Sequence, residues 1–528
     1  MLPEDKFFQT NDEKKIWERY CGFLDLTLEE FMQIQQRLLM EQIELVAGTP
    51  LAKTFMNGNK PQNVEEFRKM VPLTTYEEYA DRLCQQDESV LAEKPLYWCH
   101  SSGRGGRFKW MPYTARGFDV FAKRALATTI LGATNSKGKV NIKPGIRTLL
   151  LMPPRPYTSG SGLYNLSQRF SLRIIPSLEE TEDMEFSERV TEGFHLALQT
   201  GVDMIFSLAS VLVKMGETMS EQAQETRFSW GMLKPPVLSR LIQAKIKSRF
   251  AGRPMLPKDL WKSKAIFTSG IDVGIYRDQI TRYWGQVPYE VYGGTEVLIM
   301  AIQGWNRKWM TFVPDTAFWE FIPEEEHYKA LSDPLYQPKT VLFNEVEKGK
   351  TYEVVLTHFY GMPLLRYKIK DMVTYVELED KESGIKLPQM QFKTRVGETI
   401  NLGNLTDLDE SAIWQAIENT GIKYEDWTAR KEYRENQVCL ALYMELNEDQ
   451  NTSELELAID RELKKIDIDY QDIERMLGIQ PIKVNTLSSG TFGQYYRNKE
   501  KGGVDLANRK PPHMNASDEI IQELLKLS

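Results

Sequence analysis

The chain has 528 residues, of which 41% are hydrophobic and 27% charged, enough apolar sequence for a globular protein with more than one domain. Its formal net charge of −8 lacks the basic excess that general nucleic-acid binding requires, so we expect no nucleic-acid partner. The four cysteines and five histidines show no metal-ligand spacing, which predicts free thiols in a reducing compartment.

The first 90 or so residues are predicted to be helical. The polar start Met1–Lys6 and the shortness of every apolar run predict a cytoplasmic protein with no signal peptide and no membrane partner. Thr27–Glu30 forms a capping-box pattern, and apolar residues follow it at helical spacing. Further helices are predicted around Val64–Phe67 and, with a threonine cap, within Val71–Tyr79.

From about residue 96 onward, short apolar strands alternate with helices. The predicted strands are Thr148–Met152, Arg173–Ile175, Asp203–Phe206, Ala265–Phe267 and Tyr289–Val291, and the predicted helices are Arg116–Leu131, Ser210–Ala223 and Tyr276–Trp284. This alternation predicts an α/β fold, with several layers around mainly parallel sheets. Phe312–Phe321 and Tyr352–His358 alternate with a period of two, which is typical of antiparallel strands that close such a domain.

A polar stretch predicts a domain boundary between residues 380 and 400. Residues 379–384 are polar, and residues 395–399 have the composition of a turn-like linker. We therefore expect a large N-terminal domain over residues 1–394 and a smaller α+β C-terminal domain over residues 395–528.

A segment rich in small residues follows the apolar run that ends at His100. Two serines, Ser101 and Ser102, are followed by Gly103, Arg104 and two further glycines. Glycines let backbone N–H groups approach an anion and serine hydroxyls add donors, so the segment has the pattern of a phosphate-binding loop. A simple turn between two strands accounts for the same composition.

A second segment ends the predicted strand at Tyr292. The pair Gly293 and Gly294 would let a flat ring approach the backbone, and Tyr292 could stack on that ring. Thr295 could bond a phosphate, and Glu296 could hold a divalent cation that bridges phosphates. The alternative is a tight turn with a helix-capping threonine.

Two later segments extend the pattern. In Leu364–Val373, the carboxylate of Asp371 could bond both hydroxyls of a ribose, although a hairpin with solvent-facing charges has the same pattern. Near the C-terminus, Lys510 precedes the rigid pair Pro511–Pro512, and a mobile domain could carry it to a developing negative charge. A solvated basic turn is the alternative there.

The order and spacing of these four segments resemble the adenylate-forming superfamily of luciferases and acyl-CoA ligases. Within it, the chain is most similar to the plant-type acyl-acid amido synthetases, the auxin-responsive family with its bacterial relatives. Three segments carry the narrower resemblance: Phe67–Tyr79, Gly490–Phe492 and Asn508–Pro511. The resemblance covers nearly the whole chain.

The resemblance implies a two-step reaction. A carboxylic acid attacks ATP to give an acyl-adenylate and pyrophosphate, the C-terminal domain then rotates, and an amine, usually an amino acid, takes the acyl group. ATP and Mg²⁺ are the implied cofactors, a small carboxylic acid and an amine are the implied substrates, and a monomer is expected. An acyl-CoA ligase and a catalytically silent nucleotide-binding protein of the same fold stay open as alternatives.

Carried over by position, the resemblance also assigns roles to single residues. Phosphate contacts fall to Ser101, Ser102, Gly103 and Thr295; adenine to Tyr292 and Gly293; ribose to Asp371; the metal to Glu296; the hinge to Arg395; and the reacting centre to Lys510. Arg104, Lys109 and Gly294 are further candidates for nucleotide binding. Tyr157, Tyr164 and Phe206 are candidates for the acyl pocket, with structural packing as the alternative for each.

The chain departs from the family pattern at two of these segments. Arg104 stands where a threonine is expected, and Lys370 replaces the glycine of the motif Tyr-Arg-x-Gly-Asp. Arg104 either gives the phosphates a fixed charge with forked donors or marks a site that has lost ATP turnover. We favour the first interpretation because four other site residues are retained: Glu296, Asp371, Lys109 and Lys510.

Overall fold

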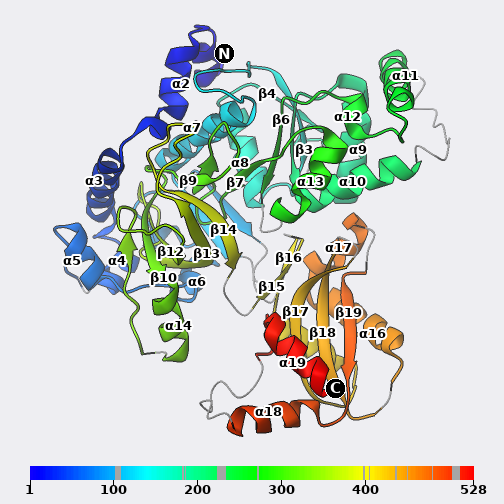
Figure 1. Ribbon diagram of the computed structural model, residues 1–528. Coiled ribbons are helices and arrows are strands. Elements are labelled where there is room, and N and C mark those ends of the chain that lie inside the picture. Colours follow the sequence, from blue (N-terminus) through cyan, green and yellow to red (C-terminus); the bar gives the residue numbers. More distant parts are fainter. Residues whose placement is uncertain are drawn as a thin grey trace. The chain divides into compact units, whose positions relative to one another are not determined.

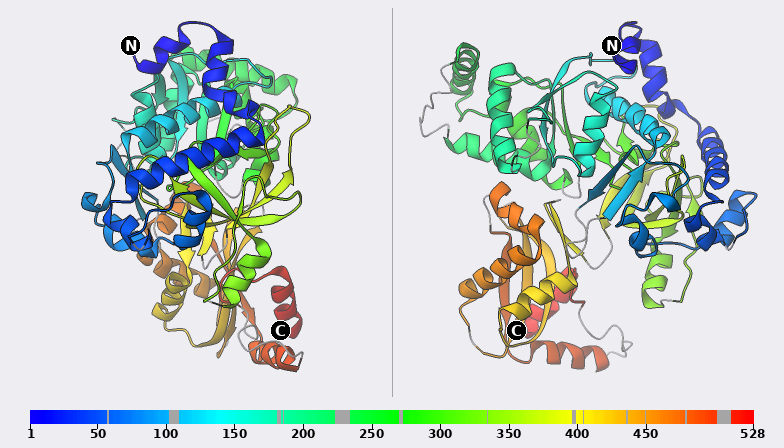
Figure 2. Two further views of the ribbon diagram at one scale, coloured as in Figure 1. Left: turned by 90° about the vertical axis from the view of Figure 1, so that its left-hand side faces the viewer. Right: turned by 180° about the vertical axis from the view of Figure 1, so that it is seen from behind.

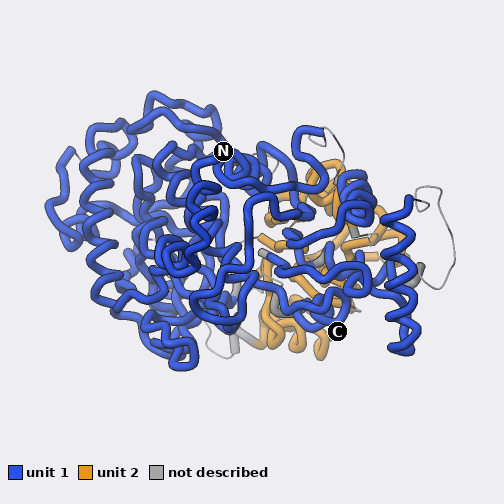
Figure 3. Tube along the Cα trace, turned by 90° about the horizontal axis from the view of Figure 1, so that it is seen from above, with its two compact units in different colours: residues 1–101, 109–396 blue, residues 102–108, 397–528 orange. Residues whose placement is uncertain are grey.

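The computed structural model describes residues 1–56, 58–101, 109–180, 184, 186–222, 234–269, 273–333, 335–395, 399–403, 405–434, 437–448, 450–477, 480–501 and 512–528. The chain divides into two compact units, residues 1–101 with 109–396 and residues 397–528 (Figure 3).

Helices α1 to α6 open the first unit. They span Pro3–Phe8, Glu13–Cys21, Leu28–Val46, Pro50–Met56, Val64–Met70 and Glu77–Leu83. The predicted capping box is confirmed, because Thr27 and Glu30 bond each other's backbone N–H groups at the start of α3. Buried Phe31 and Leu39 face the sheet, and α3 lies along strand β10 (Figure 2, left).

The predicted threonine cap within Val71–Tyr79 is wrong. Helix α6 begins at Glu77, and its N-cap residue, Tyr76, makes no side-chain capping bond. Thr75 instead donates to the Glu78 carboxylate through its backbone N–H and its hydroxyl, 2.8 and 2.6 Å away. The chain before α6 is extended because Thr74 pairs with a distant strand, as described below.

A twelve-stranded sheet forms the centre of this unit, in the order β11-β10-β12-β13-β14-β9-β8-β7-β6-β5-β3-β4 (Figure 1). In chain order the strands are β3 Ile146–Leu151, β4 Leu172–Ile175, β5 Met204–Leu208, β6 Ala265–Ser269, β7 Tyr289–Tyr292, β8 Ala301–Gln303, β9 Met310–Phe312, β10 Ala317–Pro323, β11 Val341–Leu342, β12 Thr351–His358, β13 Tyr367–Glu377 and β14 Gln389–Arg395. All five predicted strands of the α/β part are confirmed, to within one or two residues.

The expectation of mainly parallel sheets needs correction, because this sheet is mixed. Strands β4, β3, β5, β6 and β7 are parallel to their neighbours within this group, whereas the pairings from β7 onward to β11 are antiparallel. Parallel neighbours need a long crossover, and after β7 the chain mostly turns back through short connections. The predicted strand Phe312–Phe321 is accordingly divided into β9 and β10.

Helices cover the parallel part of the sheet. They are α7 Ala115–Gly132, α8 Thr158–Ser167, α9 Phe186–Thr200, α10 Ala209–Gln222, α11 Pro235–Phe250, α12 Pro257–Leu260 and α13 Val273–Trp284, and α14 Glu324–Ser332 follows β10. The three predicted helices of this part correspond to α7, α10 and α13. None of the helices in the described ranges combines the length and apolarity that a membrane crossing needs.

The second unit is an α+β domain. Strands β17 Tyr424–Arg434, β18 Gln437–Leu446 and β19 Ile482–Leu487 form one sheet, and β15 Thr399–Leu402 pairs with β16 Thr406–Asp409. The helices are α15 Glu410–Asn419, α16 Thr452–Ile466, α17 Ile468–Leu477, α18 Thr491–Lys501 and α19 Asp518–Leu527. Its core contains Trp427, Leu440 and Ile459.

Candidate active site

A hairpin of β1 Tyr97–Ser101 and β2 Lys109–Tyr113 carries the predicted phosphate loop. Ser101 pairs with Lys109 at the end of the hairpin next to the loop. Ser102, Gly103 and Arg104 lie outside the described residues, as does the side chain of Ser101. The ammonium group of half-buried Lys109 lies 5.5 Å from the centre of the Tyr76 ring.

The loop end of this hairpin is joined to the start of helix α8. The His100 backbone N–H donates to the carbonyl of Pro156, 3.1 Å away, and the Thr158 hydroxyl lies 3.0 Å from the carbonyl of His100. The Thr158 and Thr295 hydroxyl oxygens are 2.7 Å apart. This contact places the glycine–threonine–glutamate segment beside the hairpin, so two of the four predicted segments meet.

The segment after Tyr292 is a tight turn with no helix behind it. Gly293 is required by space, because a Cβ atom there would lie 2.1 Å from the carbonyl oxygen of Leu298. The Tyr113 hydroxyl donates to the Thr295 carbonyl at 3.1 Å and accepts from the Leu298 N–H at 3.1 Å. The predicted alternative of a helix-capping threonine therefore does not apply.

The third predicted segment meets the same turn from the other side. The Tyr292 phenol donates to Oδ2 of Asp371 over 2.9 Å, and the Tyr367 phenol donates to Oε1 of Glu296 over 3.1 Å. Tyr292, Asp371 and Glu296 are all more than nine-tenths buried. The predicted adenine, ribose and metal residues thus lie in one cluster around the end of β7 and the first half of β13.

Two further features belong to the strand that carries Asp371. Asp371 is the cross-strand partner of Arg395 at the end of β14, although the side chain of Arg395 lies outside the described residues. Lys370, which replaces the family's glycine, has φ +67°, a left-handed backbone conformation that glycine adopts without strain. A lysine is therefore held in a conformation suited to glycine, next to the predicted ribose carboxylate.

The N-terminal segment that carries the family resemblance supports this strand. Thr74 forms a parallel bridge with Tyr367, its N–H donates to the Arg366 carbonyl at 2.9 Å, and its hydroxyl donates to the Leu365 carbonyl at 2.7 Å. The Tyr79 hydroxyl accepts from the Leu365 N–H at 3.0 Å. Sequence reasoning gave neither residue a role, although Phe67–Tyr79 stood out by its family match.

A buried ion pair fixes the same junction. The Arg366 guanidinium donates to both oxygens of Glu320, over 3.0 and 2.9 Å, and to the backbone carbonyls of Arg68 and Val71, over 2.7 Å each. Because both charges are buried, the pair depends on these additional bonds. It ties the N-terminal helices to β10 and to the start of β13.

His358 is a positioning residue that sequence reasoning missed. Its Nδ1 accepts from the Leu364 N–H at 3.2 Å, so its Nε2–H donates to the Glu296 carbonyl, 2.7 Å away. Complete burial lowers the pKa of His358 to about 4, and the imidazole is therefore neutral at physiological pH. The neutral ring holds the backbone of the predicted metal ligand in place.

The three acyl-pocket candidates lie in the same unit, and each of their rings contacts a different residue. The Tyr157 ring packs edge-on against His100, with ring centres 4.6 Å apart, so it borders the hairpin. The Tyr164 ring carries the Arg155 guanidinium 3.6 Å above its centre. Half-buried Phe206 stacks on Phe267 at 4.3 Å. Tyr157 thus lies beside the strand that leads into the predicted phosphate loop.

The residues present are compatible with a magnesium ion that arrives with a nucleotide. Within the described ranges, no group of three or more His, Cys, Asp or Glu side chains could hold a metal alone. In Glu296, Oε1 accepts from Tyr367, and no hydrogen bond to Oε2 is recorded among the described residues. One carboxylate together with substrate phosphates is a usual ligand set for Mg²⁺.

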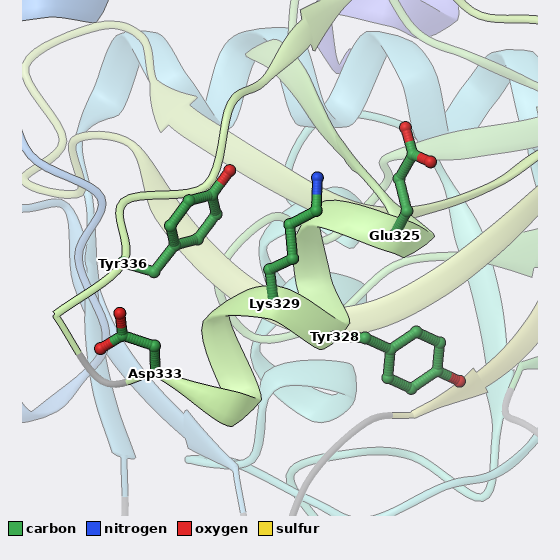
Figure 4. Close-up of a pocket in the computed structure, with 5 residues that line it drawn as sticks. All are labelled: Glu325, Tyr328, Lys329, Asp333 and Tyr336. Atoms are coloured by element: carbon green, nitrogen blue, oxygen red, sulfur yellow. The ribbon is translucent and has the colours of Figure 1, made fainter.

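A separate open hollow of about 430 Å³ lies along α14 (Figure 4). Its lining comprises Glu325, Tyr328, Lys329, Asp333 and Tyr336. None of these side chains belongs to the predicted site. The Glu326 carboxylate nearby accepts from Lys329, Tyr336 and the Lys339 N–H, and these bonds lower its pKa to about 2.

Three family models match consecutive parts of the chain. The GH3 family N-terminal domain matches residues 21–226, the GH3 family central domain residues 310–395, and the GH3 family C-terminal domain residues 409–519. Together they account for most of the sequence. Ser101 and Lys510, the first and last residues of the predicted site, fall within the N-terminal and C-terminal matches.

Over the aligned residues, curated relatives are about a quarter identical to the chain. The jasmonoyl–L-amino acid synthetase GH3.5 of Oryza sativa subsp. japonica is 26% identical over 262 residues, 44% of each chain. The indole-3-acetic acid-amido synthetase GH3.17 of Arabidopsis thaliana is 24% identical over 435 residues, 69% of this chain and 68% of the relative. The match thus spans less than half of the first relative.

Two solved structures share the fold over nearly the full length. The acyl acid amido synthetase AtGH3.15, in complex with 2,4-DB, has a TM-score of 0.53 at 19% identity and covers 96% of this chain and 95% of its own. A 2-hydroxyisobutyryl-CoA ligase, in complex with 2-HIB-AMP and CoA, has a TM-score of 0.58 at 13% identity, covering 95% and 93%.

Proposed function

This chain belongs to the GH3 family, and from that membership we propose that it is an acyl acid amido synthetase. It would activate a carboxylic acid with ATP as an acyl-adenylate and then transfer the acyl group to an amino acid. The observation that carries the proposal is the buried cluster in which Tyr292 bonds Asp371 and Tyr367 bonds Glu296. Two of the predicted segments, far apart in sequence, meet there, and Thr158 links the turn to the hairpin.

Nucleotide binding in this proposal divides among the segments of the cluster. Asp371 holds the ribose hydroxyls, and Tyr292 with Gly293 and Gly294 borders the adenine, where Gly293 leaves no room for a side chain. The phosphates are bound by the hairpin loop with its residues Ser101, Ser102, Gly103, Arg104 and Lys109, together with Thr295.

Glu296 would hold Mg²⁺, and the ion, when bound, would offset negative charge on the phosphates. The protein's own contribution is positional and electrostatic. A substrate carboxylate is already ionised at neutral pH and needs no general base to attack the α-phosphate. His358 and Tyr367 keep Glu296 in place by bonding its carbonyl and its carboxylate.

We also propose that the two domains have different roles. Residues 1–394 would bind ATP and the acyl acid, with Tyr157, Tyr164 and Phe206 toward the acyl group, and residues 395–528 would act as a mobile lid that turns about Arg395. The lid would present Lys510 to the reacting centre in one orientation. The enzyme would act as a cytoplasmic monomer on small-molecule substrates.

Exchange of labelled pyrophosphate into ATP, run with a panel of carboxylic acids, tests the first step. We expect acid-dependent exchange that Asp371→Asn reduces strongly through weaker ATP binding, with unfolding curves as the control for folding. No exchange with any acid, together with no ATP binding by calorimetry, would contradict the proposal and favour a silent nucleotide-fold protein. Product masses with amino acids against coenzyme A separate amide formation from thioester formation.

A further inference from the structure

Helix α11 carries an exposed apolar stripe on its solvent face. Leu238, Ile242, Ile246 and Phe250 recur every four residues, with exposed fractions of 39, 51, 51 and 90%. Residues four apart lie on one face of a helix, so these side chains form a continuous stripe about 18 Å long. The stripe ends in Phe250, whose ring is almost wholly exposed.

The stripe is not the face by which α11 joins the protein. Val237, Ala244 and Ser248 are buried, and α11 packs through them against α9 and α12. At about 100° per residue, the centre of the exposed stripe lies on nearly the opposite side of the helix from these three. In Figure 1, α11 lies at the outer edge of the first unit, at the right of the view.

All charged residues of α11 itself are cations. The helix has no Asp or Glu and contains Arg240, Lys245, Lys247 and Arg249, whereas Arg253 beyond its end is paired with Asp259. The whole chain, in contrast, has a net charge of −8. Lys245 and Arg249 are exposed and have no ion-pair partner among the described residues.

We propose that α11 is an interfacial helix that docks this protein on an anionic phospholipid surface. Exposed aliphatic and aromatic side chains flanked by Lys and Arg are the features of helices that lie in the plane of a membrane interface. A second copy of the chain is a poor occupant, because two facing stripes would bring Lys245, Lys247 and Arg249 of both copies together. A bilayer with acidic headgroups receives both the stripe and the cations.

This surface goes beyond the proposed activity and does not depend on it. The expectation that the protein has no membrane partner rested on the absence of an apolar run long enough to cross a bilayer, and an interfacial helix needs no such run. Docking would hold the proposed enzyme at a membrane from which an apolar carboxylic acid partitions.

Vesicle co-sedimentation of the full chain tests the proposal. With phosphatidylcholine vesicles containing about a third phosphatidylserine, we expect binding that weakens as salt rises and that is much weaker with phosphatidylcholine alone. The double variant Lys245→Glu/Arg249→Glu should lower the partition coefficient at least about twentyfold. Ile246→Gln/Phe250→Gln should lower it about tenfold or more.

Matched controls use exposed residues away from α11. Leu335→Gln, at a side chain 89% exposed, and Lys381→Glu, at a side chain 85% exposed, should leave binding unchanged. No binding of the unaltered chain to the anionic vesicles at low salt, or binding that the α11 variants do not change, would overturn the proposal. A concentration-dependent dimer that Ile246→Gln/Phe250→Gln abolishes, without vesicle binding, would assign the stripe to a second copy instead.

Discussion

The phenol of Tyr292 donates a hydrogen bond to the carboxylate of Asp371, 79 residues further along the chain, over 2.9 Å. Both side chains are buried, so the carboxylate depends on protein donors to replace water. The bond links the turn that would border the adenine to the strand that would hold the ribose. A substitution at either residue therefore removes a hydrogen bond from the other.

Tyr292→Phe removes the hydroxyl and leaves the ring. Hydrogen bonds to charged groups contribute about 1.5–3 kcal/mol, so we expect a loss of this size in the free energy of unfolding, together with weaker ATP binding. Urea unfolding and calorimetry measure the two effects. Tyr375→Phe is the matched control, because the buried Tyr375 hydroxyl has no hydrogen-bond partner among the residues that the structure describes, and its removal should cost almost nothing. Equal stability losses in the two variants would contradict the role of the Tyr292 bond.

Lys370 offers a test of backbone strain beside Asp371. With φ at +67°, Lys370→Gly should be more stable than Lys370→Ala by about 1 kcal/mol, because the two variants differ only in the Cβ atom that is strained there. At Lys368, which has no positive φ, the same pair should show the reverse order by about 0.5–1 kcal/mol. Chemical denaturation measures the free energy of unfolding of the four variants. If the Gly and Ala variants have the same order of stability at both positions, the backbone at Lys370 is not strained.

In the turn after Tyr292, alanine should destabilise the protein more at Gly293 than at Gly294. In Gly293→Ala, the added Cβ would meet the Leu298 carbonyl at 2.1 Å, whereas in Gly294→Ala it would meet the Glu296 carboxylate at 3.2 Å and the end of Met300 at 3.4 Å. Backbone cannot move aside as side chains do, so we expect Gly293→Ala to cost about 3 kcal/mol and Gly294→Ala clearly less. Thermal unfolding and ATP titration measure the difference. A milder effect at Gly293 than at Gly294 would be inconsistent with the turn as described.

His358 should make stability fall in mild acid. Its pKa is lowered to about 4 in the folded protein and returns to an ordinary value near 6.5 on unfolding, so the unfolded state binds more protons between these limits. The contribution of neutral His358, on the order of 3 kcal/mol, is complete above pH 6.5 and is lost as pH falls toward 4. The stability difference between the unaltered protein and His358→Gln should therefore narrow over this range. A constant difference would argue against the neutral, buried ring.

His513 in the second unit should show the opposite dependence. Its Nε2 lies 2.9 Å from Asp426, its Nδ1 lies 2.6 Å from Glu410, and the ring stacks on Trp427. The bond to Asp426, followed by that to Glu410, raises the pKa of His513. Its stabilisation is complete below pH 6.5 and is lost as pH rises through the raised pKa. In thermal unfolding, His513→Gln should thus destabilise the protein more at pH 6 than at pH 9. A larger effect at pH 9 would contradict a stabilising interaction of charged His513 with Asp426 and Glu410.

Much of the fold could be predicted from the sequence because it depends on local patterns. The strands from Thr148 to Val291 and the helix after Thr27 follow from apolar periodicity and capping residues, which act within a few positions of the chain. Strand direction beyond β7 could not be predicted in the same way, because it depends on which distant strands pair. The threonine cap failed for the same reason: Thr74 bonds Leu365 instead.

Only some residues of the candidate site could be identified from the sequence. Tyr292, Glu296 and Asp371 could be identified from motifs and their order, and the structure brings them together. His358 and Arg366 could not be identified, because a lone histidine in a strand and a charged residue in a hairpin carry no local sign of burial. Roles for Arg104 and Lys510 stay predictions, since both lie outside the described residues.

The bond between Thr74 and Leu365 has a consequence for biosynthesis. The two residues are separated by 291 positions, and at roughly 5–20 residues per second a ribosome needs about 15–60 s to span that gap. Helix α3, which packs against β10, also has to wait for a distant strand to be synthesised, and contacts of such long range slow folding. The N-terminal helices, residues 3–83, are therefore the segment for which a nascent-chain chaperone would matter most.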